Sequence, residues 1–252
     1  MAKKFYYDSV NLLTATITEG AHNPSDNAFT TSSTDITNEH AIADQSLSLA
    51  VTGMGDEDTL RLDFGSEVTI TDILTYSNSD STENDALAWY YNTAGTNVGT
   101  LFGTNVAQPP GWDLVSASTQ TKRYWYARSV HNDYAGLAEV IMGVPLEFEN
   151  EPDIGSSTQE IFATDINKSY GGVEYANKRH DPVSTWTLNF KNISQTFKNN
   201  LVSFEDSVTN YKKFVYYDDS SYHYVRLDAP INFVEVAHQR FSASIKLREQ
   251  LS

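Results

Sequence analysis

Six histidines are the first candidates for chemistry in this chain of 252 residues, because imidazole can bind a metal or transfer a proton. None of them falls into the H-x-H or H-E-x-x-H spacing of a metal site: they are His22, His40, His131, His180, His223 and His238. Arg179-His180-Asp181 contains a His-Asp pair, but a triad also needs an activated nucleophile and the chain has no G-x-S-x-G elbow. We therefore expect structural or solvated histidines and no enzymatic activity.

The carboxylate run Asp56-Glu57-Asp58 is the candidate metal site, because hard cations such as calcium take carboxylate oxygens. The EF-hand loop pattern is absent, and such a run is more often a solvated turn. The chain has no cysteine, which excludes disulfides, thiolate metal sites and cysteine nucleophiles. We expect no cofactor, with a structural calcium ion as the alternative.

Aromatic side chains beside a few fixed polar groups can hold a sugar, and the chain has several clusters of them. Alternation along a strand buries about half of such residues, so Trp89 and Trp125 are expected in the core. Trp112 lies in the turn-rich stretch QPPGWD and is the tryptophan most expected to be exposed. The candidate carbohydrate-binding residues are Trp112, Tyr90 and Tyr91.

Charge is distributed unevenly along the chain, whose formal net charge is −16. Residues 1–150 carry 6 Lys and Arg against 20 Asp and Glu, whereas residues 151–252 carry 11 against 13. This asymmetry indicates two domains, and the acidic half argues against sequence-independent binding of nucleic acid. The start of the chain does not read as a secretory signal, and no stretch approaches the ~20 apolar residues of a membrane span, so no membrane insertion is expected.

The first half alternates short extended segments with turn residues, which is typical of a β-sandwich or barrel. The expected strands lie in 59–65, 68–78, 86–99 (an aromatic strand followed by a Gly-bearing turn), 122–132 and 137–148, and residues 19–45 read as a long turn-rich loop. The acidic, polar stretch 149–158 reads as a linker. The expected domains are therefore residues 1–150 and residues 151–252.

The second half contains one predicted helix between strands. The segment TWTLNF alternates with a period of two, and Ser194 is the expected N-cap of the helix that follows. A helix with a single apolar stripe must lie on a sheet face, and the other face is left for solvent or a neighbouring subunit. The residues expected to pack this helix on a sheet of five or six strands are Trp186, Leu188, Phe190, Phe197, Leu201, Phe204 and Val208. A hairpin over 214–227 and strands over 233–238 and 240–251 are expected to complete the sheet.

Residues 8–147 resemble a galactose-binding-like jelly roll of the discoidin type. The resemblance is carried by the opening Asn11–Thr16, by TLRLDFGSEVTITDI, and by the closing pair RYWYAR and LAEVIMG. The family's middle strand is replaced here by WYYNTAGTNVGTLFG. The resemblance implies a β-sandwich, with a sugar-binding domain and a decoration domain that makes protein–protein contacts as the two alternatives.

Residues 160–252 resemble the C-terminal part of a bacteriophage tail protein with a tail-tube-like fold. Four pieces occur in the family's order: WTLNFKNIS, LVSFEDSV, YVRLDAPINF and FSASIKLREQL. The resemblance implies a small β-sheet or barrel with one buttressing helix, whose copies join into a ring. A hexamer is favoured and a trimer is the alternative; DNA would pass through the ring's channel without specific contact.

The sequence therefore predicts a mainly β protein, an N-terminal jelly roll followed by a tail-tube-like domain. The first functional hypothesis is a ring-forming distal tail or baseplate component of a tailed bacteriophage. Such a protein would be assembled in the host cytoplasm, reside in the virion, and bind other tail and baseplate proteins. The alternative hypothesis is a lectin-like carbohydrate-binding module that recognises host-surface glycans.

Overall fold

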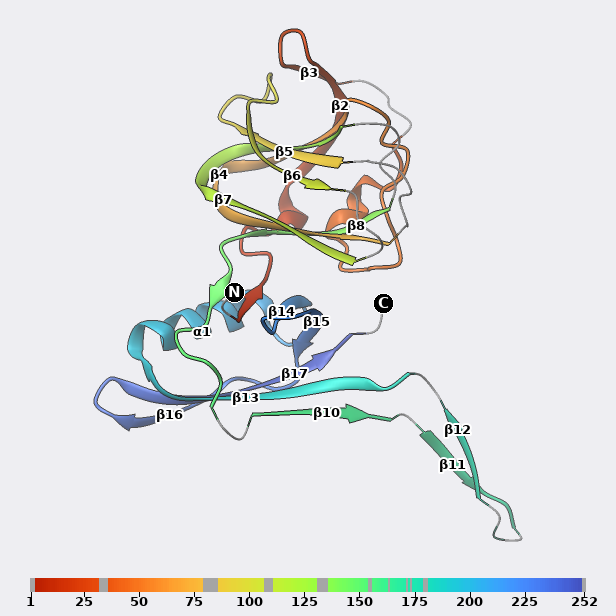
Figure 1. Cartoon of the computed structure of the whole chain (residues 1–252), viewed down its shortest axis with the longest axis vertical. Coiled ribbons are helices and arrows are strands. Elements are labelled where there is room, and N and C mark those ends of the chain that lie inside the picture. The colour runs from red at the N-terminus through yellow and green to blue at the C-terminus, as the bar shows by residue number, and fades with distance from the viewer. Residues whose placement is uncertain are drawn as a thin grey trace. The chain divides into compact units, whose positions relative to one another are not determined.

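The computed structural model describes all residues except 1–2, 32–35, 79–85, 107–110, 131–135, 154–155, 163, 171, 173, 179–180 and 251–252. The described residues confirm a mainly β protein with one α-helix (Figure 1). They form two compact units: Tyr6–Pro145, here the jelly-roll unit, and Met1–Phe5 with Leu146–Leu251, here the helix-bearing unit. The predicted boundary at 150/151 stays a prediction, and it differs from these limits because residues 1–5 and 146–150 belong to the helix-bearing unit.

The jelly-roll unit contains one seven-stranded antiparallel sheet that curls on itself. Its strands run in the order β3-β2-β4-β7-β5-β6, and β8 also pairs with β4. Their bounds are β2 Thr16–Asn23, β3 Ala28–Thr31, β4 Asp58–Ser77, β5 Ala86–Asn92, β6 Thr100–Val106, β7 Gly111–Ser129 and β8 Leu137–Gly143. Short 3-10 helices cover Leu12–Thr14 and Glu39–Ala43, so the loop expected over 19–45 holds two strands and a helical turn.

Strands β4 and β7 are long and bent, and they carry the sheet from one layer of the sandwich to the other (Figure 1). Thr59–Asp63 pairs with Tyr124–Arg128, whereas Asp72–Ser77 pairs with Gly111–Ser116 and with β8. Two register shifts separate these stretches, and bulges of this kind bend a strand. The two strands expected at 59–65 and 68–78 are therefore one continuous strand.

The core of this unit lies between the two layers. Leu60, Leu62, Trp89 and Trp125 are fully buried, which confirms the expectation for both tryptophans. The indole Nε1 of Trp89 donates to Asn105 Oδ1 over 2.8 Å, so its polar atom is satisfied inside the core.

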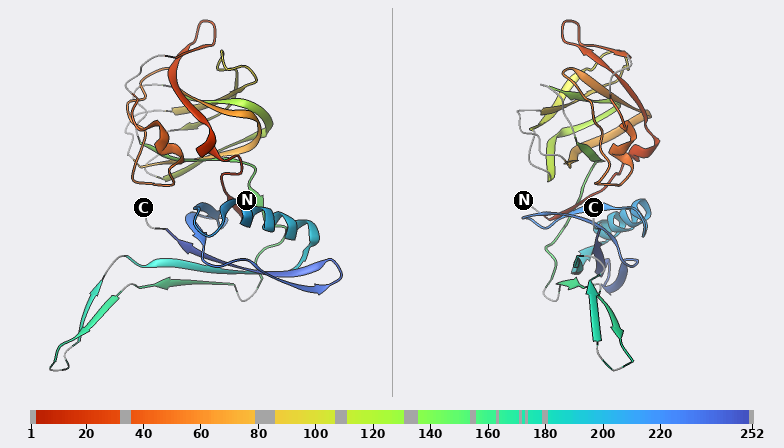
Figure 2. Two further views of the ribbon diagram at one scale, coloured as in Figure 1. Left: turned by 180° about the vertical axis from the view of Figure 1, so that it is seen from behind. Right: turned by 90° about the vertical axis from the view of Figure 1, so that its right-hand side faces the viewer.

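The helix-bearing unit has an eight-stranded sheet rather than the five or six strands expected. Its order is β10-β13-β17-β15-β14-β1-β9, with β16 also paired to β17. The bounds are β1 Lys4–Tyr6, β9 Leu146–Glu147, β10 Ser157–Ile161, β13 Val183–Ser194, β14 Phe214–Tyr217, β15 Tyr222–Leu227, β16 Asn232–Ala237 and β17 Arg240–Glu249. Strands β11 (Thr164–Lys168) and β12 (Glu174–Lys178) form a separate two-stranded ribbon (Figure 2).

Helix α1 (Gln195–Val208) lies on one face of this sheet, against β13 and β17 (Figure 2). Ser194 caps it as predicted: its side chain accepts a hydrogen bond from the backbone N–H of Phe197 over 3.0 Å. The helix buries Phe197, Leu201, Phe204 and Val208. The ring of Phe197 lies 6.1 Å from that of Phe190 on β13. No helix among the described residues is long and apolar enough to cross a membrane.

The other strand residues expected to support the helix are also buried, but Trp186 has different neighbours. Leu188 and Phe190 are 4% and 1% exposed. The ring of Trp186 lies 4.8 Å from His223 and 6.1 Å from Tyr216, in the hairpin formed by β14 and β15. Trp186 therefore fixes that hairpin on β13.

Phe5, near the start of the chain, lies at the centre of the helix-bearing core. Its ring stacks on Phe204 of α1 at 4.9 Å and meets the edges of Phe148 at 4.8 Å and Phe214 at 5.2 Å. Strand β1 pairs with β9, with Phe5 opposite Leu146. The jelly-roll unit is thus inserted between two paired strands of the other unit.

Replacing Phe5 with alanine is expected to destabilise the helix-bearing unit by about 3–5 kcal/mol, since Phe→Ala in a core removes apolar contacts and leaves a cavity. Denaturant unfolding of the full chain, followed by tryptophan fluorescence, measures this change. Tyr211→Ala is the matched control, because Tyr211 is in the same unit and 68% exposed. Equal stability of both variants would contradict the central position of Phe5.

The turn between β14 and β15 gives a pH prediction through Asp218. Burial alone would raise the pKa of this carboxyl, but hydrogen bonds from Ser220, His223 and the backbone N–H of Ser221 outweigh it and hold the pKa well below its ordinary value. Asp218 therefore stabilises the fold above pH ~4, and this contribution is lost as the pH falls below that value.

Asp218→Asn is accordingly expected to lower the melting temperature at pH 7, and the difference from the unsubstituted protein should shrink between pH 4 and pH 2. Thermal unfolding by circular dichroism across this range measures it. Asp206→Asn, on the exposed side of α1, is the control. A difference that is constant with pH would show that Asp218 does not act through its charge.

Candidate functional site

The structure does not bring the three predicted sugar-binding residues together. Tyr91 points into the jelly-roll core, where its ring lies 5.7 Å from Trp125. Trp112 is on strand β7 rather than in an open turn, and its half-buried ring lies 5.1 Å from Tyr76. Tyr90 is on the opposite face of β5 from Tyr91, so the predicted set is divided between faces.

Part of this opposite face is covered by the β2–β3 hairpin and by the turn after β5. The backbone N–H of Phe29 donates to Thr96 O, and that of Val98 donates to Asn27 O. Together with Tyr126, Phe29 and Val98 form a second small core. Gly20 permits this cover, because a Cβ atom there would lie 2.4 Å from Thr30 O.

Next to this small core lies a cluster of polar side chains around Tyr90. His22 comes from β2, Glu57 from the turn before β4, and Arg128 from β7. The Nδ1 atom of His22 lies 2.5 Å from Glu57 Oε2, and Arg128 Nη1 lies 3.5 Å from the same oxygen. The guanidinium of Arg128 is 5.1 Å from the centre of the Tyr90 ring, a cation–π contact. Four strands or strand ends thus converge on one cluster.

His22 holds the cluster in place through both ring nitrogens. Its Nε2 donates to Asn27 Oδ1 over 3.0 Å, and the Asn27 amide is oriented by its own bond to Gly99 O. In the neutral ring Nδ1 accepts from Arg128 Nη1 at 2.9 Å; in the protonated ring it donates to Glu57. In either form, His22 fixes one of the two charged groups.

Two residues of this cluster have left-handed backbone conformations. Glu57 and Asn27 have φ values of 65° and 58°, in the region that favours glycine. Seven further non-glycine residues of the described chain share this conformation, so it does not by itself distinguish the cluster.

The charged groups keep free hydrogen-bonding positions. The side chains of Glu57 and Arg128 are 30% and 13% exposed, and that of His22 is 5% exposed. Within the described parts of the chain, neither Glu57 Oε1 nor Arg128 Nη2 has a hydrogen-bond partner. The cluster therefore offers an acceptor and a donor side by side next to an aromatic ring.

The three residues predicted to bind a metal ion are adjacent in sequence, but their side chains have different contacts. Glu57 belongs to the cluster, Asp58 Oδ2 accepts from the backbone N–H of Gly55, and Asp56 is exposed. Among the residues that the structure describes, no group of three or more His, Asp or Glu is arranged to hold a metal ion. The calcium hypothesis stays a prediction.

The cluster was not predicted from the sequence, because its members are 35 and 106 residues apart and only the strand register joins them. The sequence singled out His22 as a histidine and Glu57 as a carboxylate, but no spacing related them. His131, Arg179 and His180 lie outside the described residues, so their predicted roles stay predictions.

No protein-family model matches this chain, and no curated protein matches it in sequence. Solved structures give weak matches that cover about half of the chain. Chitosan-binding module 1 of a chitosanase/glucanase from Paenibacillus sp. IK-5 is 12% identical over 54% of this chain and 98% of its own, with a TM-score of 0.39.

A fucose-binding module from Streptococcus pneumoniae is 10% identical over 53% of this chain and 93% of its own, with a TM-score of 0.35. The lectin domain of lectinolysin, solved with Lewis B antigen, is 10% identical over 54% and 96%, with a TM-score of 0.36. These values assign no function to this chain.

Proposed function

We propose that the jelly-roll unit binds a carbohydrate at the cluster of His22, Glu57, Tyr90 and Arg128. The observation that carries this proposal is the unpartnered pair of Glu57 Oε1 and Arg128 Nη2 beside a tyrosine ring. A sugar hydroxyl is both a donor and an acceptor, so neighbouring hydroxyls can use both groups at once. Hydrogen bonds to ionised partners are the stronger ones, which suits recognition at an open surface.

A neutral, hydroxyl-rich ligand fits this cluster better than an anion does. The positive charge of Arg128 already faces the carboxylate of Glu57 at 3.5 Å, so no full charge is left to attract an anionic group. Tyr90 supplies an apolar ring with a polar tip, as sites for amphipathic ligands require. His22 acts as the positioning residue, since both charged groups contact it.

Glu57→Gln and Arg128→Lys are each expected to weaken sugar binding about tenfold or more, since a hydrogen bond to a charged group contributes about 1.5–3 kcal/mol. A glycan array with the full chain identifies the best-binding neutral sugar, and titration calorimetry measures the variants against it. Glu67→Gln removes an exposed carboxylate from the same unit and is the control. Retention of full affinity in both site variants would exclude this cluster as the site.

A second function, assembly into a ring as a phage tail or baseplate component, is favoured by the edges of the other sheet. Strand β10 pairs only with β13, and β16 pairs only with β17, so both present an open edge within the described structure. Ile161 is 44% exposed, Phe162 follows β10 and is 68% exposed, and Val234 and Val236 of β16 are 52% and 56% exposed. Apolar open edges are a liability unless a partner strand covers them.

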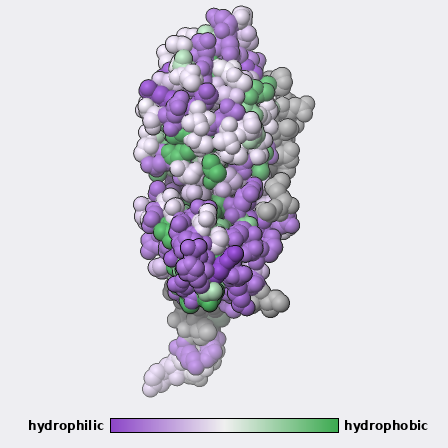
Figure 3. Space-filling view, turned by 90° about the vertical axis from the view of Figure 1, so that its left-hand side faces the viewer, coloured by the Kyte–Doolittle hydropathy of each residue, from purple (hydrophilic) through white to green (hydrophobic). Residues whose placement is uncertain are grey.

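Pairing of one edge with the other edge of the next copy would be head-to-tail, and such contacts close into rings or extend into filaments. On the side shown in Figure 3, hydrophobic residues form small scattered groups on a mostly hydrophilic surface. The contact proposed is strand pairing between these open edges.

Light scattering of the full chain is expected to give the mass of a trimer or hexamer at high concentration, and Val236→Lys is expected to reduce it to the monomer mass. A charge on an edge strand opposes pairing without removing a core contact. Val144→Lys, at an exposed valine of the jelly-roll unit, is the control. A monomer at the highest soluble concentration, or an oligomer that survives Val236→Lys, would count against edge pairing.

A further inference from the structure

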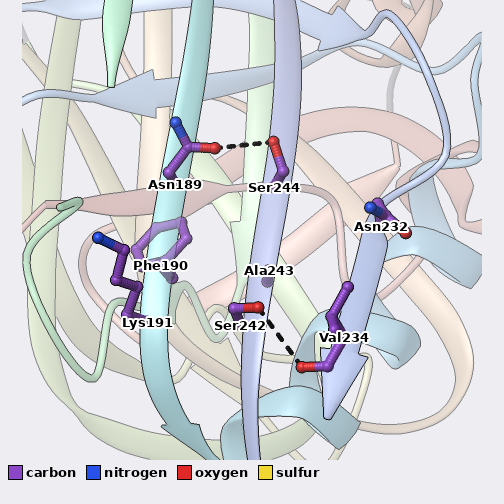
Figure 4. Close-up of a pocket in the computed structure, with 8 residues that line it drawn as sticks. All are labelled: Asn189, Phe190, Lys191, Asn232, Val234, Ser242, Ala243 and Ser244. Atoms are coloured by element: carbon purple, nitrogen blue, oxygen red, sulfur yellow. Dashed lines mark hydrogen bonds between the residues drawn. The ribbon is translucent and has the colours of Figure 1, made fainter. Parts of the chain in front are cut away.

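The face of β13, β17 and β16 that points away from α1 is polar and basic. Phe190, Ala243 and Ile245 point towards the helix and are buried. By strand alternation the outward positions on β13 and β17 include Thr185, Thr187, Asn189, Ser242, Ser244 and Lys246, and those paired with them on β16 are Asn232 and Val234. Figure 4 shows part of this outward row across the three strands.

A shallow groove of about 260 Å³ lies on this face (Figure 4). Its polar lining consists of Asn189, Lys191, Asn232, Ser242 and Ser244. Ser244 donates to Asn189 Oδ1 over 2.9 Å, and Ser242 donates to Val234 O over 3.4 Å, so the groove has fixed hydroxyl and amide groups. Lys191 stands at its rim and is exposed.

The cations continue along the strands beyond the groove. Lys246 is the register partner of Thr187, and Arg248 is that of Thr185. Both cations are on the same sheet face as Asn189 and Ser244. At about 3.3 Å per residue, Lys246 lies roughly 13 Å and Arg248 roughly 20 Å along β17 from Ser242 in the groove. Within the described residues, Lys191, Lys246 and Arg248 form no ion pair.

Two arginines are also paired in register on this face, and Arg226 Nη1 donates to the backbone oxygens of Asn210 and Leu227. Arg226 of β15 is the register partner of Arg248 of β17. Like charges directly opposite each other on adjacent strands are destabilising. Asp228 lies 3.8 Å from Arg226 Nη2 and balances one of the two charges, which leaves Arg248 uncompensated.

We propose that this face is a second saccharide site, which binds an acidic polysaccharide along β17. Its carboxylate or sulfate groups bind Arg248, Lys246 and Lys191, and its hydroxyls bind the amide and hydroxyl groups of the groove. An anion at Arg248 relieves the like-charge pair with Arg226, and charge-assisted bonds from guanidinium are strong and directional. The site is independent of the cluster at His22, which lies in the other unit.

An acidic saccharide fits these features better than a nucleic acid does. Single-stranded nucleic acid is held by aromatic side chains on which bases stack, and the outward positions described on β13, β16 and β17 carry none. Those positions instead carry hydroxyl and amide side chains at the spacing of a strand.

The test is calorimetric titration of the full chain with three probes of similar length. These are a heparin-derived sulfated octasaccharide, an uncharged glucan octasaccharide and an oligothymidylate. The sulfated probe is expected to bind, and raising the salt concentration is expected to weaken it. The uncharged probe is titrated into the Glu57→Gln variant, in which the neutral-sugar site is weakened. There it is expected to bind at least about tenfold more weakly than the sulfated probe, because it cannot make the cationic contacts.

The double variant Lys246→Thr with Arg248→Thr is expected to bind the sulfated probe about tenfold or more weakly. Lys122→Thr removes a cation from the jelly-roll unit and is expected to change affinity less than about twofold, because Lys122 is not part of the proposed site. Arg248→Thr alone should leave the melting temperature of the free protein unchanged or higher, because it removes a like-charge pair. That measurement separates loss of the site from loss of the fold.

Unchanged binding by the double variant, or no binding of the sulfated probe by the unsubstituted protein, would overturn this proposal. Tighter binding of oligothymidylate than of the sulfated probe would also overturn it and assign the face to nucleic acid. Glu57→Gln should bind the sulfated probe as the unsubstituted protein does. Failure of the neutral-sugar site and failure of this site are therefore distinguishable.

Discussion

The pairing of β1 with β9 is the constraint on which the organisation of the chain depends. It places Phe5 opposite Leu146 and inserts the Phe5 ring between Phe204, Phe148 and Phe214. The helix-bearing unit therefore needs a strand from the start of the chain, and residues 151–252 alone lack both β1 and Phe148. A contact between residues about 140 positions apart closes a long loop, and non-local contacts of this kind slow folding. Folding of the jelly-roll unit within that loop would shorten the effective separation before β1 and β9 pair.

Most strands and the helix could be predicted, because local patterns determine them. The alternation in TWTLNF, the cap at Ser194 and the apolar stripe of α1 each have one physical interpretation, and the structure has these elements at those positions. The insertion could not be predicted, since a three-residue strand such as β1 is too short to show a period. The continuity of β4 was missed for a different reason. The turn formers near Gly65, with φ of 73°, mark a bulge inside a strand rather than its end.

Local sequence patterns predict even less of the two candidate sites than of the fold. Nothing in the sequence joins His22, Glu57 and Arg128, because sheet register alone brings β2, β4 and β7 together. The basic row on β17 is visible in the sequence as alternating Ser, Ser, Lys and Arg, but its register with Arg226 is not. The overall charge also hides it, because −16 describes an acidic protein and says nothing of one sheet face. Alternation in the sequence thus predicts the sheet face on which each residue lies. The pairing of strands, which the sequence does not show, determines which residues are its neighbours.

The two proposed sites differ in how their charges are compensated, and this difference sets their ligands. At the cluster, Arg128 and Glu57 neutralise each other through His22, so only hydrogen bonds remain for a ligand. On β17, Arg248 is opposed by another arginine, so an anion gains from a charge that the fold leaves unbalanced. A single site at an open surface binds its ligand with low affinity, because few groups lose their water there. Assembly through the edges of β10 and β16 would present many copies together, and linked sites bind with an affinity well above that of one site. The proposals of assembly and of saccharide binding are thus compatible with each other in one molecule.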